Sequence, residues 1–481
     1  MISSRHVRPL IQLQCLLMFM LSILALILIV SYIVMFTVDK PSLQKTFFGI
    51  NHAGNTDGDG TNSDIIVMQQ RSGKVAEITG VSGVRSSRSS REPRESIATV
   101  AYAISVMGCG DGSEPLVDGA AVLKHSILLS SIENPQSTSK YSYKVYAIIH
   151  PEALQCTKKQ LASHGYTILV RKEPVAVNDI EGEFLRERVE RNGCCGAKEF
   201  IKLHAYTITD HPIVVHLDLD TLILKPLDDV FDAMLYDEAT DIGQNARKSL
   251  PVFLTDIFPK EPNAFFTRDY NMHQGKTTSK ALVQGGFLVL RPSLDTYKIF
   301  CNVIKEGDYR SNGGWGGKGY GAYGAMTFQG IIPYFYDQLQ PGTAVELNRC
   351  FYNNMCDNPR DHKTVNDIVS GKCCDGRTDC EDCRSVDVTL IKTAHFTLCQ
   401  KPWHCLPSDD DRIQERLCRK LHHEWFRVRK DLEDFLIASK KQRRSVATGT
   451  FQPDHFYGFC IQRGERGYIS MGELIVQPSF T

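Results

Sequence analysis

Two aspartates, one residue apart, interrupt an apolar stretch near the middle of the chain. In VVHLDLDTLIL, residues 214–224, Asp218 and Asp220 follow a run that is typical of a buried strand. A carboxylate inside such a strand is costly unless a partner balances its charge. Two carboxylates at a strand end can hold a hard divalent cation, and that cation can neutralise phosphate oxygens of a ligand. The pair therefore predicts a metal-assisted phosphate site.

The segments around this pair predict an α/β domain. Strand-like segments alternate with helix-like ones in the order 99–107, 115–131, 143–150, 156–166, 167–175, 196–208 and 212–224. This alternation is typical of a mostly parallel sheet with helices on both faces. Ligands bind such sheets beyond the carboxyl ends of the strands, which is where Asp218 and Asp220 lie. A further amphipathic helix is expected within residues 409–439.

Composition indicates a globular protein with an attached membrane segment. The chain has 481 residues, 42% of them apolar and 23% charged, and its net charge is zero, so nucleic acid is not an expected partner. Residues 16–38 carry no charge and are long enough to span a bilayer, so we expect an uncleaved signal anchor after a cytoplasmic tail, 1–15. Residues 39–95, rich in Gly, Ser, Asn, Asp and Arg, predict a disordered stem.

Cysteine usage predicts the compartment. Of the 16 cysteines, eight form a cluster: Cys350, Cys356, Cys373, Cys374, Cys380, Cys383, Cys399 and Cys405. This density suits disulfides in an oxidising lumen, although the spacing of Cys380 and Cys383 leaves a zinc site as the alternative. We expect a single-pass type II membrane protein of the Golgi or ER. Its lumenal domain would span 97–437, with a Cys-rich insertion at 350–405 and a C-terminal extension at 438–481.

Four segments together resemble glycosyltransferase family 8. Residues 200–232, which contain the aspartate pair, are followed in the family's order by VQGGFLVLRPS (283–293), TFQGII (327–332) and HFTLCQKPW (395–403). The resemblance implies the GT-A type fold of nucleotide-diphospho-sugar transferases. It also implies retaining transfer of a hexose from a UDP-sugar, with Mn²⁺ as cofactor. The acceptor would be a lumenal protein, lipid or polysaccharide.

The resemblance also implies roles for particular residues. Asp218, Asp220 and His395 would be the metal ligands, and carboxylates with imidazole suit Mn²⁺. Lys401 would reach the diphosphate and stabilise the leaving UDP as a catalytic residue. Each assignment has a structural alternative; a lone His395, for example, could be an ordinary surface histidine.

Further residues would contact the donor. Lys202 would face it, although a solvated helix lysine is nearly as plausible from the sequence. Gln284, Gly285 and Gly286 would let the backbone approach the sugar closely. Gln329 would lie beside the anomeric carbon as a second catalytic residue.

The chain also departs from the family pattern, which keeps two alternatives open. Phe328 stands where the family has Asp before Gln-Gly, Leu398 replaces a glycine of the His-to-Lys motif, and Leu116 replaces a tyrosine that stacks on uracil. These changes motivate a catalytically weak relative that binds sugar nucleotide without turnover. The other alternative is a D-x-D phosphohydrolase of the haloacid-dehalogenase type. That class expects Thr or Val four residues after its first Asp, where this chain has Leu222.

Overall fold

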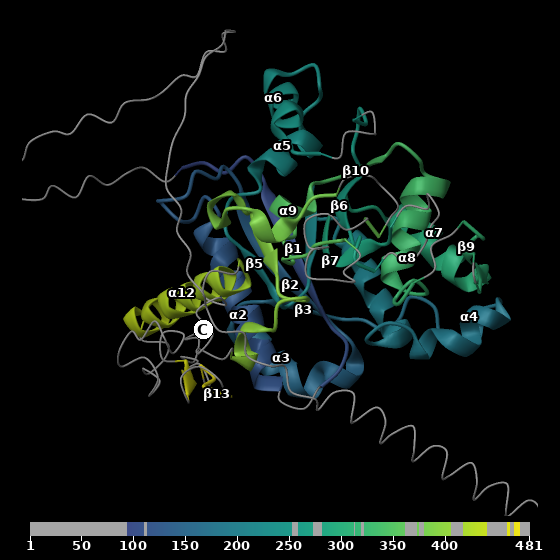
Figure 1. The fold of residues 1–481 in the computed structure, drawn as a ribbon, viewed down its shortest axis with the longest axis horizontal. Helices are drawn as coiled ribbons and strands as arrows, with labels where there is room; N and C mark the ends of the chain where they lie inside the picture. The colour runs from purple at the N-terminus through teal and green to yellow at the C-terminus, as the bar shows by residue number, and fades with distance from the viewer. Residues whose placement is uncertain are drawn as a thin grey trace, which may run out of the picture. The chain divides into compact units, whose positions relative to one another are not determined.

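A mixed β-sheet of seven strands forms the centre of the described part of the chain (Figure 1). The computed structural model describes residues 94–109, 113–252, 258–272, 281–311, 313–318, 322–360, 373–374, 380–405, 417–439, 459–461 and 466–471. These residues all lie within one compact unit, 89–481. The predicted tail 1–15, the span 16–38 and nearly all of the stem 39–95 lie outside the described residues. Among the residues described, no helix combines the length and the apolar character that a membrane crossing needs.

The strands of this sheet follow the order β10-β6-β7-β4-β1-β2-β3. Their bounds are β1 Thr99–Val106, β2 Ser142–Ile149, β3 Thr167–Val170, β4 Val214–Leu217, β6 Ala264–Arg268, β7 Val283–Leu290 and β10 Ala344–Glu346. Strands β3, β2, β1 and β4 are mutually parallel, as are β6 and β10, whereas β7 runs antiparallel to both β4 and β6. The predicted α/β class with a mixed, mostly parallel sheet is therefore confirmed.

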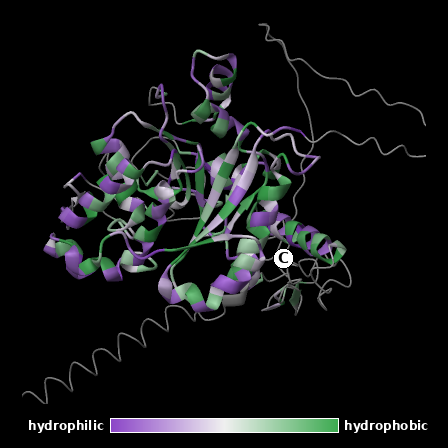
Figure 2. Ribbon diagram, turned by 180° about the vertical axis from the view of Figure 1, so that it is seen from behind, coloured by the Kyte–Doolittle hydropathy of each residue, from purple (hydrophilic) through white to green (hydrophobic). Residues whose placement is uncertain are grey.

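Helices cover both faces of the sheet (Figure 1). One core contains α2 (Ser113–Leu129), α3 (Leu154–Ser163) and α5 (Asp228–Leu235). The opposite core contains η4 (Gly196–Thr207), α7 (Leu294–Glu306) and α8 (Phe328–Tyr334). In Figure 2 the helices carry hydrophobic residues beside hydrophilic ones, as expected for helices with one buried face.

Shorter elements connect and extend these layers. The remaining α-helices are α4 (Glu183–Arg188), α6 (Asp241–Ser249), α9 (Arg349–Tyr352) and α12 (Leu417–Ala438). Single turns and short helices are η1 (Pro151–Ala153), η2 (Val177–Asp179), η3 (Val189–Arg191), η5 (Phe335–Leu339), η6 (Cys383–Ser385), η7 (Val388–Leu390) and η8 (Pro402–His404). Three small sheets pair β5 (Thr221–Ile223) with β11 (Thr393–His395), β8 (Tyr309–Arg310) with β9 (Gly314–Trp315), and β12 (Cys460–Ile461) with β13 (Arg466–Tyr468).

Local sequence accounts for the main elements. Strand β7 is an almost continuous apolar run, and all eight of its residues are buried, as expected for a strand covered on both faces. Helix α7 begins where the Ser293 hydroxyl accepts a hydrogen bond from the backbone N–H of Thr296. It ends at Gly307, whose φ of 64° is a left-handed conformation that glycine adopts without steric cost.

The structure changes three of the expected elements. The segment 212–224 is not one strand: β4 stays in the central sheet, the chain turns at Asp218–Asp220, and β5 pairs with β11 instead. The strand expected over 167–175 stops at Val170, because its partner β2 ends at the residue paired with Val170. The helix expected over 196–208 forms, but with 3₁₀ geometry.

Disulfides account for most of the cysteine cluster. Among the described residues the bonds are Cys109–Cys156, Cys350–Cys383, Cys373–Cys380, Cys399–Cys418 and Cys405–Cys460. Cys380 and Cys383, the pair with zinc-ligand spacing, belong to two different disulfides, so the zinc alternative for this pair is wrong. Two of the bonds leave the cluster and attach its end to α12 and to β12. Lys401 lies between Cys399 and Cys405, so a disulfide on each side of it attaches its loop to the C-terminal part of the chain.

Candidate active site

The turn between β4 and β5 positions the two aspartates. The backbone N–H of Asp218 donates to the carbonyl of Gly286 on β7, at 3.1 Å, and the N–H of Phe396 donates to the carbonyl of Asp220, at 2.9 Å. Because β11 pairs antiparallel with β5, its last residue, His395, comes beside the turn. The two neighbouring aspartates and the distant His395 therefore meet beyond the carboxyl end of β4.

The side chains of these residues converge on one point. His395 Nε2 lies 3.3 Å from Asp220 Oδ1 and 3.8 Å from Asp218 Oδ2, and one ligand atom from each residue lies within 4.8 Å of the others. Asp220 and His395 are buried, while Asp218 is partly exposed. Two carboxylates and one imidazole are a donor set that divalent manganese accepts. The residues predicted as metal ligands therefore fit a divalent cation. The site is accessible from the cleft on the side of Asp218.

Two lysines balance the carboxylate charge. Lys202 Nζ donates to Asp218 Oδ1 at 2.8 Å, and Lys401 Nζ forms an ion pair with Asp220. Burial disfavours a charged Lys202, yet Asp218 keeps the pKa of this lysine above its ordinary value. Burial likewise opposes ionisation of Asp220, but His395 and Lys401 hold its pKa well below the ordinary range. Each carboxylate of the centre is therefore paired with the ammonium of one lysine.

The glycines of β7 leave room for this arrangement. A Cβ atom placed on Gly286 would lie 2.3 Å from Cε1 of His395, which only the absence of a side chain permits. A Cβ on the neighbouring Gly285 would meet Cγ of Gln329 at 3.1 Å. The side chain of Gln284 folds back and accepts a hydrogen bond from the Gly286 N–H at 2.6 Å. Gln284 thus holds the glycine backbone in place.

A cleft of about 480 Å³ opens over the centre. Its size is in the range of small-molecule sites. Of the residues predicted to form the site, all except Gly286 line this cleft, and Gly286 lies against His395 and Asp218. The wall consists of Ser105, Val106, Met107, Gly108, Leu116, Cys194, Cys195, Glu199, Lys202, Asp218, Leu219, Asp220, Asp269, Met272, Gln284, Gly285, Tyr323, Gln329, His395, Thr397, Lys401 and Trp403.

The positions that depart from the family pattern have different environments. Leu116 lines the cleft, where the resemblance placed a base-stacking residue. Leu398 is 56% exposed and does not line the cleft, so it does not crowd the site. Phe328 is fully buried beneath the cleft, with its ring 5.6 Å from Lys202 Nζ. No carboxylate reaches the cleft from that position.

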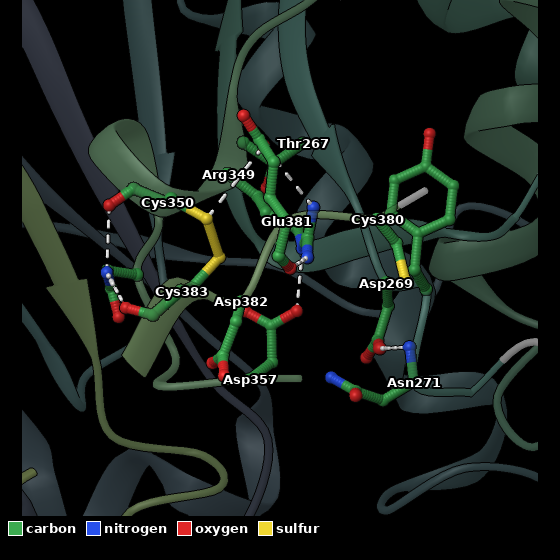
Figure 3. Close-up of polar contacts among 12 residues, drawn as sticks. Thr267, Asp269, Asn271, Arg349, Cys350, Asp357, Cys380, Glu381, Asp382 and Cys383 are labelled. Carbon is green, nitrogen blue, oxygen red and sulfur yellow. Dashed lines mark hydrogen bonds and ion pairs between the residues drawn. A yellow bond between two sulfur atoms is a disulfide. The ribbon is translucent and has the colours of Figure 1, made fainter. Parts of the chain in front are cut away.

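Asp269 also lines the cleft, although it was not among the residues predicted from the sequence. It follows the last residue of β6, and its carboxylate accepts hydrogen bonds from the backbone N–H of Asn271, as Figure 3 shows, and from that of Met272. Burial, and then the nearby carboxylate of Asp357, raise the pKa of Asp269 to about 6. Asp269, like Asp218, directly follows a strand, but Thr267 and Arg268 separate it from the apolar residues of β6, so the pattern in the sequence is weaker.

The side chains of Asp357 and Arg349 stabilise the surroundings of Asp269. Both are buried, and Arg349 Nε donates to Asp357 Oδ2 at 2.6 Å. The Cys350–Cys383 disulfide lies in the same group of side chains (Figure 3). A buried charge pair next to a disulfide gives this side of the cleft a rigid support.

Two adjacent cysteines were also missed. Cys194 and Cys195 line the cleft beside Glu199, three residues before Lys202. The sequence CCGAKEFIK shows the pair, but nothing in it places the two thiols next to the aspartates, which follow more than 20 residues later. Only the packing of η4 beneath the sheet brings them to the site.

Comparison with known proteins shows that part of the chain is similar to a glycogenin. No protein-family model matches the chain. Glycogenin-1 of Caenorhabditis elegans is 30% identical over 125 residues, which is 26% of this chain and 26% of glycogenin-1. The chain thus spans about a quarter of the length of the curated relative it matches. For that part of the chain, the resemblance to glycosyltransferase family 8 is confirmed.

Solved structures of glycosyltransferases align with a larger share of the chain. The apo form of mouse xyloside xylosyltransferase 1 has 13% identity and a TM-score of 0.38, covering 63% of this chain and 99% of its own. The galactosyltransferase LgtC, in complex with donor and acceptor sugar analogs, has 13% identity and a TM-score of 0.37, covering 69% of this chain and 95% of its own.

Proposed function

We propose that this chain, similar in part to glycogenin, is a metal-dependent glycosyltransferase of the GT-A type. It would move a hexose from a UDP-sugar to a protein, lipid or polysaccharide acceptor with retention of configuration. One observation carries the proposal: Asp218, Asp220 and His395 converge at a cleft that also presents Lys202 and Lys401. Carboxylates for a cation, together with lysines for a diphosphate, form the charge pattern that a nucleotide-sugar donor needs.

Manganese bound by Asp218, Asp220 and His395 would neutralise the diphosphate of the donor. Lys401 pairs with Asp220 and lines the cleft, so its ammonium would be available to that diphosphate. As the sugar–phosphate bond breaks, Lys401 would stabilise the negative charge that develops on UDP. Lys202 would hold Asp218 in place, because it donates both to that carboxylate and to the Gly285 carbonyl.

The carboxylates of the cleft favour a route without a protein nucleophile. Glu199 is buried, and both of its oxygens accept hydrogen bonds, from Cys194 and from the Thr327 hydroxyl. Asp269 is also buried, and with its pKa raised to about 6 its carboxyl keeps a proton below that pH, where the protonated form is a poor nucleophile. The Gln329 side chain, which is neutral, lies in the wall next to Gly285. A front-face reaction passes through an ion-pair-like transition state and uses no protein nucleophile. It needs only the positive charges of the metal and of Lys401 to stabilise the leaving diphosphate.

The deciding experiment is hydrolysis of UDP-hexoses in the absence of an acceptor. With Mn²⁺, the purified chain should slowly release UDP from one member of a panel of UDP-glucose, UDP-galactose, UDP-glucuronate and their N-acetyl relatives. Chelation should stop the release. A phosphohydrolase would instead release inorganic phosphate from simple phosphomonoesters. A non-catalytic relative would show a higher melting temperature with UDP and Mn²⁺ but release nothing.

We also propose that the domain is lumenal and membrane-anchored through residues 16–38, in the Golgi or ER. Five disulfides among the described residues support an oxidising compartment. In intact microsomes, the domain should resist added protease until detergent opens the membrane. Digestion without detergent would refute this orientation.

A further inference from the structure

Cys194 and Cys195 form a vicinal pair of thiols in the wall of the cleft. They lie between η3 and η4, and their sulfur atoms are 2.7 Å apart. Cys194 is exposed and Cys195 is half-buried, so a small reagent in the cleft can reach the pair. Neither belongs to the disulfides of the described residues. The two sulfurs are close enough to react with each other without rearrangement of the fold.

The pair is hydrogen-bonded to the interior of the site through Glu199. Oε1 of Glu199 accepts from the Cys194 N–H at 3.1 Å and from the Cys194 thiol at 3.3 Å. Oε2 accepts from the hydroxyl of Thr327 at 2.9 Å, and Thr327 directly precedes the helix that carries Gln329. A chemical change at Cys194 can therefore affect two parts of the cleft wall, Glu199 on η4 and the start of α8, which carries Gln329.

The surroundings favour reaction at Cys195 first. The sulfur–sulfur contact with Cys194 lowers the pKa of Cys195; burial and the carboxylate of Glu199 oppose this shift, and the ammonium of Lys202 assists it. The same contact, with burial and Glu199, raises the pKa of Cys194, whose one thiol proton can be donated either to Glu199 or to the Cys195 sulfur. The thiolate, which is the reactive form, is thus favoured on one member of the pair.

The backbone on either side can adapt to a ring. Gly193 and Gly196 flank the pair with φ of 70° and 60°, values that glycine adopts freely. A disulfide between adjacent residues closes a small ring that constrains the peptide bond within it. Strained disulfides are more easily reduced than relaxed ones, which suits a reversible rather than a permanent bond.

We propose that Cys194 and Cys195 are a redox-active site that closes reversibly to a vicinal disulfide in the cleft wall. The oxidant is a small-molecule disulfide such as glutathione disulfide. The Cys195 thiolate attacks one sulfur of the oxidant, which forms a mixed disulfide and releases one glutathione thiolate. Cys194 loses its proton and attacks the Cys195 sulfur, which releases the second glutathione. Two protein thiols are oxidised by two electrons, and one disulfide is reduced to two thiols.

Closure of the ring changes the cleft. The Cys194 sulfur loses its proton and can no longer donate to Glu199, while the ring restrains the backbone N–H that donates to the same carboxylate. Because Glu199 also accepts from Thr327, the oxidised and reduced forms should bind the donor nucleotide with different affinity. This consequence rests on the proposed function of the cleft, whereas formation of the disulfide does not.

Peptide mass tests the disulfide itself. The intact chain is equilibrated at several ratios of reduced to oxidised glutathione, quenched with acid, alkylated with N-ethylmaleimide and digested with trypsin. Residues 192–198, NGCCGAK, form one tryptic peptide that contains both cysteines and no other. We expect this peptide to pass from a doubly alkylated form to an unalkylated form that is two hydrogens lighter than the dithiol. Two alkylated thiols at every ratio, or one glutathione adduct without ring closure, would overturn the proposal.

Single variants provide the matched controls. Cys194→Ser and Cys195→Ser should each trap a glutathione adduct on the remaining thiol, because no second thiol can release it. Cys301→Ser removes a half-buried thiol on α7 that does not line the cleft, and should leave the behaviour of the 192–198 peptide unchanged.

Nucleotide binding tests the coupling to the cleft. Titration of the oxidised and reduced chain with UDP in the presence of Mn²⁺ should give different dissociation constants. Full transmission of the lost Cys194–Glu199 hydrogen bond to the cleft would make the difference roughly tenfold, which is the upper bound. The UDP affinity of the Cys194→Ser/Cys195→Ser double variant should not depend on the ratio of reduced to oxidised glutathione in the buffer. Equal affinity of both wild-type forms would refute the coupling. Absence of UDP binding in every form would refute the proposed function, while the peptide masses would still decide on the disulfide.

Discussion

Gly286→Ala should disable the metal centre without removing any ligand. The added Cβ would lie 2.3 Å from Cε1 of His395, 2.8 Å from Nδ1 of the same ring and 2.9 Å from Oδ2 of Asp218. An ordinary van der Waals contact of a Cβ atom has a distance of about 3.4 Å or more. The imidazole must therefore move by roughly 1 Å. The backbone has little freedom to move instead, because Gly286 accepts a hydrogen bond from the Asp218 N–H and donates one to the Gln284 side chain.

The size of the effect follows from this displacement. Metal–ligand distances are tolerant to only about 0.2 Å, and a disturbed ligand shell typically reduces metal affinity by roughly 10- to 100-fold. We expect a loss of Mn²⁺ affinity in that range for Gly286→Ala. Overpacking of a buried position costs about 1–3 kcal/mol of folding stability, which should leave the domain folded.

Calorimetric titration of the chelator-treated chain with Mn²⁺ measures the affinity, and thermal unfolding followed by circular dichroism measures the stability. Gly108→Ala is the matched control. A Cβ at Gly108 has no neighbour within 4 Å, so its stability and metal affinity should be those of the wild type. If Gly286→Ala binds Mn²⁺ as tightly as the wild type, His395 and Asp218 are not both ligands and the proposed centre is wrong.

Three further predictions concern individual side chains. Asp218→Asn or Asp220→Asn should abolish metal-dependent UDP binding in titrations, and His395→Ala should weaken metal binding more than it lowers the melting temperature; unchanged Mn²⁺ and UDP binding in all three would contradict the metal assignment. Lys401→Ala should lower the rate of UDP release more than the affinity for the donor, because the lysine acts on charge that develops as the bond breaks; an effect on affinity alone would assign it only to binding. Burial raises the pKa of Asp269 to about 6, so the folded chain keeps a proton that the unfolded chain releases above its ordinary pKa near 3.8. Stability should therefore fall by up to about 3 kcal/mol as pH rises from 4 to 6.5, and Asp269→Asn should remove this decrease in urea unfolding with chelator present; an identical pH profile for the variant would show that Asp269 does not titrate in this window.

The sequence by itself determined the features that depend on local pattern. The apolar run before Asp218 indicated a strand leading into the two carboxylates, and β4 runs up to the residue before Asp218. Alternation of strands and helices indicated the mixed sheet, because the side-chain periodicity of each element is encoded within that element. The order of four short motifs then pointed to His395 and Lys401 as partners of the aspartates, and the structure brings both to the turn.

Only the tertiary structure decided which distant groups meet at the site. The aspartate turn breaks the expected strand in two because β5 finds a better partner in β11, more than 160 residues later in the chain, than in the central sheet. The same kind of long-range packing places Asp269 and the thiols of Cys194 and Cys195 in the cleft, and it selects partners outside the cysteine cluster for Cys399 and Cys405. A local pattern fixes how one segment folds, whereas contacts between segments depend on the shape and charge of every surface that competes for them. No spacing in the sequence carries that information.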